Sequence, residues 1–176
     1  MKYYLCAVIL LLCFTKSYSQ NSDLNKTHNI KATFLGLGYA YEHPISSKIA
    51  LNGEIMLGGA FGYSLWGGDY WLVAPVLRFE PRYYYNRTKR EQKGKKLIHN
   101  AGNYLSISID HQLGDISIGD NAESISSYSI IPKWGLKRCI GKNWIFEFAA
   151  GIGTYKEEHF DWETAVGLDL KIGYSF

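Results

Sequence analysis

The histidines are the first candidates for catalysis or metal binding in this sequence, because an imidazole group can act as a general base or bind a metal near neutral pH. His111 lies near the end of an alternating segment, and Ser117 follows six residues later. A Ser–His pair at the edge of a bilayer could deacylate or acylate a lipid. However, Leu113 stands two positions after His111, and no acidic residue is clearly placed to orient the imidazole. We expect His111 to be an interfacial side chain, and a deacylase-like, lipid-modifying enzyme is the alternative.

Metal, redox and nucleotide chemistry find no support in the residue spacing. His43, His99 and His159 are scattered near expected turns without metal-ligand spacing. Cys139 is the only cysteine after residue 20, so it lacks a partner for a disulfide or a thiol-redox site. The glycine pairs lack the following Lys-Ser/Thr of a phosphate-binding loop. We therefore predict no catalytic residue, no metal site and no cofactor.

Charged residues recur on one face of several alternating segments. Those expected to face an interior are Glu42, Glu54, Arg78, Glu80, Arg82, Asp110, Lys133, Lys137, Glu147, Asp169 and Lys171. Because an unpaired charge is costly in a confined space, mixed signs there predict ion pairs that neutralise one another. A narrow pore lined by the same charges is the alternative.

The segment from Trp162 to Phe176 shows the alternation most clearly. Its even positions are almost wholly apolar with aromatic rings at both ends, whereas its odd positions are small or charged. Successive side chains of a β-strand point to opposite faces, so this pattern predicts a strand with one apolar face. Six further segments share the period: 35–42, 48–61, 71–85, 105–110, 128–137 and 144–153.

The composition of the second face favours a membrane barrel over a soluble sheet. A soluble sheet places long solvated side chains opposite its core, but here the polar face is rich in Gly, Ala and Ser with opposite charges interspersed. Such a face fits the narrow interior of a barrel of about eight strands, and the aromatic ends of the other face fit an interfacial girdle. Pro75, Pro81 and Pro132 lie on the apolar face and predict bulges or strand ends.

Connections of alternating length indicate an up-and-down topology. Residues 44–47 and 139–143 form short turns, whereas 63–70, 114–124 and 156–161 form longer loops. In bacterial barrels short turns face the periplasm and long loops face outward. Seven segments are clear, and the even strand number of such barrels predicts an eighth, irregular strand within 20–32. The basic stretch 86–100 then falls on the periplasmic side as a solvated strand extension or loop, or as a contact for acidic lipid headgroups or a periplasmic partner.

The first residues are typical of a secretory signal peptide. Lys2 precedes an unbroken apolar run from Leu5 to Phe14, and Ser17 and Ser19 suit cleavage before Gln20. We expect residues 1–19 to be the signal peptide and residues 20–176 to be one barrel domain. Removing Lys2 and Lys16 lowers the formal charge from +3 to +1, so bulk charge gives no support to nucleic-acid binding.

The chain resembles the small outer-membrane β-barrel proteins of Bacteroidetes, which include families of unknown function. The resemblance covers most of the mature chain and is carried by 36–42 (GLGYAYE), 81–85 (PRYYY) and 171–176 (KIGYSF). It implies an all-β, single antiparallel transmembrane barrel in the outer membrane. It also implies that Tyr174 and Phe176 form the signal read by the barrel-assembly machinery.

The expected function follows from this architecture. We predict a non-enzymatic, monomeric barrel in contact with outer-membrane lipids, with a structural role or a ligand or adhesion role through its outer loops. Trp66, Tyr70 and Trp71 could make the loop bases adhesive or anchor them among headgroups.

Overall fold

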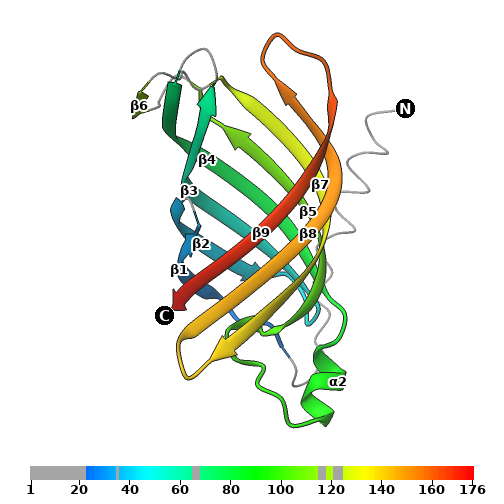
Figure 1. Ribbon diagram of the computed structural model, residues 1–176. Coiled ribbons are helices and arrows are strands. Elements are labelled where there is room, and N and C mark those ends of the chain that lie inside the picture. Colours follow the sequence, from blue (N-terminus) through cyan, green and yellow to red (C-terminus); the bar gives the residue numbers. More distant parts are fainter. Residues whose placement is uncertain (1–22, 35, 65–67, 115–117, 121–124) are drawn as a thin grey trace, which may run out of the picture.

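Eight long antiparallel strands close into a barrel in the computed structural model, which describes residues 23–34, 36–64, 68–114, 118–120 and 125–176 (Figure 1). In chain order the elements are β1 (Thr27–Thr33), β2 (Gly36–Pro44), β3 (Ile49–Ser64), β4 (Gly68–Tyr84), α2 (Arg87–Gln92), the 3₁₀ helix η1 (Ile98–Asn100), β5 (Gly102–Gln112), β6 (Ile118–Asp120), β7 (Ser127–Ile140), β8 (Trp144–Glu157) and β9 (Glu163–Ser175). The signal-peptide prediction and the residues Trp66 and Ser117 lie outside the described residues.

Neighbouring strands pair in chain order, as an up-and-down topology requires. The order is β3-β2-β1-β9-β8-β7-β5-β4, and pairing of β3 with β4 closes the ring. The eighth strand predicted within 20–32 is β1, which joins β2 on one side and β9 on the other. In the part of the chain that is described, no helix is long and apolar enough to cross a membrane.

The alternation predicted from sequence sets the two faces of every long strand. On β9, Leu168, Leu170 and Ile172 are exposed by 69%, 54% and 54%, whereas Lys171 between them is buried. The outer wall therefore carries the apolar side chains and the interior carries the polar ones. This distribution is the reverse of that in a soluble globular domain.

Prolines interrupt hydrogen-bond ladders without creating bulges. The β4–β5 register is the same on both sides of Pro81, with Phe79 opposite Ile109 and Arg82 opposite Ser106, but the two pairs between these are missing. The β7–β8 ladder likewise skips Pro132 with its register unchanged. The prediction of bulges or strand ends is therefore wrong at both sites, because β4 and β7 continue through Pro81 and Pro132 with unchanged register. A proline removes one N–H donor, and flanking pairs can hold the register across that gap.

Three of the predicted connections differ from the structure. Strands β3 and β4 extend as a paired hairpin as far as Ser64 and Gly68, so most of the loop predicted at 63–70 is strand. The predicted loop 114–124 contains β6, which pairs with residues 71–73 of β4. The basic stretch 86–100, expected as a strand extension or loop, contains α2 and η1. Residues Arg87–Gln92 are mostly good helix formers. The stretch was nevertheless predicted as a loop or strand extension, because it is polar and basic throughout.

The segment around α2 lies at one end of the barrel, which we call the α2 end (Figure 1). The backbone N–H of Asn25 donates to Asn100 Oδ1, and Asn100 Nδ2 donates to the carbonyl of Asn25, both at 2.8 Å. Arg87 donates to the carbonyls of Asp23, Leu97 and Ala101. Leu24 is thereby held in the barrel mouth, where it packs with Tyr84 and Tyr104.

Candidate functional site

The interior of the barrel holds the charged residues predicted to face it. Nine of the eleven are 9% exposed or less, namely Glu42, Glu54, Arg78, Glu80, Arg82, Lys133, Lys137, Glu147 and Lys171. The side chains of the other two, Asp110 and Asp169, are 15% and 14% exposed. Alternation places them inward from seven different strands, because each occupies the inward parity of its strand.

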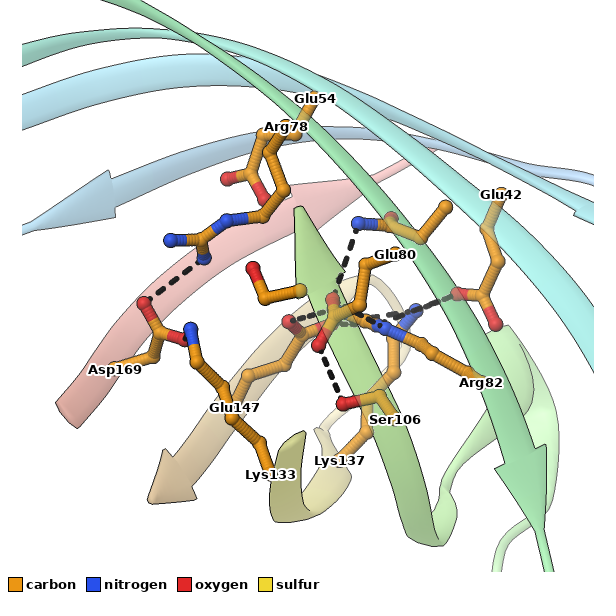
Figure 2. A network of polar contacts seen from close by, with 12 residues as sticks. Glu42, Glu54, Arg78, Glu80, Arg82, Ser106, Lys133, Lys137, Glu147 and Asp169 are labelled. Atoms are coloured by element: carbon orange, nitrogen blue, oxygen red, sulfur yellow. Dashed lines mark hydrogen bonds and ion pairs between the residues drawn. The ribbon is translucent and has the colours of Figure 1, made fainter. Parts of the chain in front are cut away.

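Glu147 is the centre of the network near the α2 end (Figure 2). Its carboxylate lies 3.0 Å from Lys31 Nζ, 3.4 Å from an Arg82 nitrogen and 3.5 Å from Lys137 Nζ. Lys137 also reaches Glu42 at 2.8 Å, and the hydroxyl of Tyr84 donates to the same carboxylate at 2.7 Å. Two buried carboxylates thus share three cations across the barrel.

Arg82 links this cluster to Glu80. Its Nε and Nη2 donate to Glu80 Oε2 at 2.8 and 2.5 Å, and its guanidinium carbon lies 4.6 Å from the ring centroid of Tyr104. Ser106 Oγ donates to the other Glu80 oxygen at 2.7 Å (Figure 2). Arg82, Tyr84 and Tyr104 are among the largest fully buried side chains, so bulky groups from the neighbouring strands β4 and β5 fill the lumen at this level.

A second cluster lies toward the opposite end, which we call the loop end. Arg78 makes a bidentate contact with Asp110 at 2.7 and 2.9 Å. A further contact joins Arg78 to Asp169 at 2.9 Å (Figure 2). Lys133 donates to Asp169 at 2.7 Å. Lys171 bonds both oxygens of Glu54 at 2.8 and 3.0 Å.

The described lumen charges balance. The cations are Lys31, Arg78, Arg82, Lys133, Lys137 and Lys171, and the carboxylates are Glu42, Glu54, Glu80, Asp110, Glu147 and Asp169. Six positive and six negative groups give no net charge, and each of them takes part in an ion pair. Mutual pairing offsets the desolvation that each charge would otherwise suffer.

Sequence reasoning missed Lys31 and the neutral groups that complete the network. Lys31 and Asn29 are fully buried on β1, and Asn52 and Ser108 are fully buried on β3 and β5. The signal for β1 was present: Thr27, Asn29 and Lys31 alternate with His28, Ile30 and Ala32. The two sets differ little in polarity, because His28 and Ala32 are not strongly apolar, so this strand of only seven residues was not recognised.

His111 lies in a cavity of about 550 Å³ at the loop end, lined among others by Tyr128, Ser126 and Lys156. Its ring stacks at a tilt on Tyr128, with centroids 4.2 Å apart. The fold therefore brings a serine into the cavity that sequence spacing did not suggest. Among the described residues, however, His111 Nδ1 is buried without a hydrogen-bond partner, so none of the described carboxylates orients the imidazole through this nitrogen, as a catalytic histidine requires.

The remaining candidate residues make local contacts. His43 Nδ1 hydrogen-bonds Tyr41, and His99 bonds the carbonyl of Lys142. Cys139 is a free thiol. Within the described ranges, no three His, Cys, Asp or Glu side chains are grouped so that they could hold a metal ion.

The two residues of the predicted assembly signal lie at the end of β9. Tyr174 is 43% exposed on the outer wall and meets the ring of Trp144 edge-on at 5.8 Å. The backbone N–H of Phe176 donates to the carbonyl of His28 on β1. These contacts tie the last residues to β8 and β1, the strands on either side of β9, and recognition by the assembly machinery stays a prediction.

None of the family models, curated proteins or solved structures compared with this chain matches it.

Proposed function

We propose that the protein is an integral, monomeric outer-membrane β-barrel, exported with a cleaved signal peptide, and that its role is structural or is exerted through its outer loops. The observation that carries this proposal is the inverted burial of its wall. Leu170 is 54% exposed, while Lys171, the next residue, is 2% exposed and ion-paired inside. Exposed apolar side chains recur around the barrel on every long strand.

A bilayer is the surrounding that such a wall requires. Soluble monomers rarely expose contiguous apolar patches beyond a few hundred Å², whereas a closed barrel satisfies its backbone hydrogen bonds internally and can stand in hydrocarbon. Aromatic residues border the wall: Tyr83, Tyr85, Trp134, Trp144 and Tyr174 toward the α2 end, and Tyr128 and Trp162 toward the loop end. These positions suit the interfacial girdles of outer-membrane barrels.

The filled lumen favours a structural or loop-mediated role over conduction. Arg82, Tyr84 and Tyr104 are fully buried in the interior, where the Lys137–Glu42 pair joins the opposite strands β7 and β2 and the Lys31–Glu147 pair joins β1 to β8. An ion passing this level would have to displace paired charges from one another, which is costly in a low-dielectric interior. With the α2 end in the periplasm, the loops at the other end face outward, where they would meet a ligand or a surface.

Membrane fractionation combined with gel migration tests the proposal. The full chain, expressed in a bacterium with an outer membrane, is expected in the outer-membrane fraction without residues 1–19. Unheated samples should migrate differently from boiled ones, because a folded barrel resists detergent. The purified barrel should produce no steady conductance in planar bilayers. A protein that stays in solution without detergent, or that conducts as wild type, would contradict the proposal.

A further inference from the structure

A cationic cavity lies outside the barrel wall at the α2 end. It has a volume of about 470 Å³, and its lining includes Lys89, Arg90, Lys93, Lys95 and Arg138 together with Tyr85 and two asparagines. No carboxylate is among the described residues that line it. Five cations around one cavity, without a counter-charge, contrast with the balanced pairs of the lumen.

The two arginines of this cavity are held in place by the backbone. Arg138 donates to the carbonyls of Gly102 and Lys137 at 3.1 and 2.9 Å and to Asn103 Oδ1 at 2.5 Å. Arg90 Nη2 donates to the carbonyl of Lys96 at 3.0 Å. Hydrogen bonds therefore orient both guanidinium groups before any ligand arrives, Arg138 through three contacts and Arg90 through one, which lowers the entropic cost of binding.

Arg90 retains an unused donor. Its Nε is buried and has no hydrogen-bond partner among the residues that the structure describes, and burial lowers the pKa of this guanidinium. Arg90 and Arg138 also interact as like charges. A buried donor without an acceptor and two cations that repel each other would both be relieved by an anion between them.

The cavity adjoins the aromatic border of the wall. Trp134 Nε1 donates to the hydroxyl of Tyr85 at 2.8 Å, and these side chains are 40% and 43% exposed. Arg138 lies four residues after Trp134 on the outward parity of β7. An anion bound in the cavity would therefore lie at the level of the lipid headgroups, next to the border of the apolar wall at the α2 end.

We infer that this cavity binds the phosphate group of an anionic phospholipid in the periplasmic leaflet. The assignment rests on the proposed membrane function for its choice of a lipid as the source of the phosphate. Arginine forks and lysine ammonium groups are the side chains that recognise phosphate oxygens. The lipid's acyl chains would continue along the apolar wall above Trp134 and Tyr85.

Titration calorimetry on the full barrel in a neutral maltoside detergent tests this inference. The probes are dihexanoyl phosphatidylglycerol, the matching phosphatidylcholine and inorganic phosphate. Phosphatidylglycerol should bind in a saturable manner and at least about tenfold more tightly than the other two. Replacing Lys89, Lys93 and Lys95 by Gln should weaken its binding by at least about tenfold, because each basic residue near an anionic headgroup is worth about 1 kcal/mol.

The matched control replaces Lys26, Lys48 and Lys142 by Gln. These three lysines are exposed near the same end but do not line the cavity, so affinity should stay within about twofold of wild type. Arg90→Gln should weaken binding as well, and unaltered heat-dependent migration verifies that each variant folds. Within the described part of the chain, the side chains of Lys89, Lys93 and Lys95 make no hydrogen bond or ion pair that the fold could lose, so their variant tests binding even if an arginine variant unfolds.

Three results would overturn the inference: no saturable binding of phosphatidylglycerol, equal weakening by both lysine triples, or equal affinity for inorganic phosphate. Equal affinity for inorganic phosphate would show that the cavity is a phosphate site that does not recognise a lipid. Because the titration is done in detergent, it is independent of membrane insertion in the cell. A barrel that binds phosphatidylglycerol through the cavity yet fractionates as a soluble protein would refute only the proposed membrane function.

Discussion

Lys31 on β1 donates a 3.0 Å hydrogen bond to Glu147 on β8, and 116 residues separate the two in the chain. Both side chains are at most 2% exposed. The contact bridges over β9, which lies between β1 and β8 in the barrel and pairs with both. The shortest of the long strands is thereby locked into the closed ring by a buried charge as well as by its backbone ladders.

Lys31→Met should destabilise the barrel by about 1.5–3 kcal/mol, the contribution of a hydrogen bond between charged groups. Glu147 would keep Arg82 and Lys137 at 3.4 and 3.5 Å, so the loss should remain partial. Urea unfolding in detergent micelles, followed by tryptophan fluorescence, measures the free energy of unfolding. Lys26→Met is the matched control, because Lys26 is exposed just before β1. Equal losses in the two variants would argue against the Lys31–Glu147 contact.

Glu54→Gln should cost about 3–5 kcal/mol, because it removes the close partner of the buried Lys171 ammonium. Asp169 lies 3.9 Å from this ammonium and would compensate only weakly. The double variant Glu54→Leu/Lys171→Met removes both charges and should recover most of the loss. Urea unfolding in detergent micelles again measures the free energy of unfolding. A double variant less stable than Glu54→Gln would contradict the proposed pairing.

Gly135→Val should destabilise the barrel by about 1–3 kcal/mol through overpacking. A Cβ at Gly135 would collide with the ring of Tyr104, the residue opposite it on β5. Gly53→Val is the control, since a Cβ at Gly53 meets nothing within 4 Å. Midpoints of thermal unfolding in micelles would show the difference, and an unchanged midpoint for Gly135→Val would mean that Tyr104 lies elsewhere.

Leu170→Arg should cost about 2–4 kcal/mol if Leu170 faces hydrocarbon near the bilayer midplane, as the proposed membrane function requires. Thr164→Arg tests the depth dependence on the same strand and the same exposed face. Near the loop end, its cost should be about 0–1 kcal/mol. Unfolding from phospholipid vesicles measures both costs. Equal costs at the two positions would contradict a hydrocarbon surrounding for Leu170.

The class of fold and the facing of the strands were predictable from the sequence because they depend on local geometry. Side chains alternate along any extended strand, so the apolar residues of 162–176 had to share one face, and Asp169 and Lys171 had to share the other. The even strand number predicted that a strand preceded residue 33, although its pattern was weak. The helix α2 was missed, because six residues give too short a run for a helical period to stand out.

Partners and cavities depended on the tertiary structure. The sequence by itself determined that opposite charges would be enclosed together, but not that Glu147 meets Lys31 or that Lys171 meets Glu54. Those pairings depend on the stagger between strands and on the closure of the ring, which no single segment encodes. The cationic cavity also depends on the tertiary structure. Arg138 and Arg90 lie 48 positions apart in the chain, and only the packing of α2 next to the ends of β5 and β7 brings their charges together.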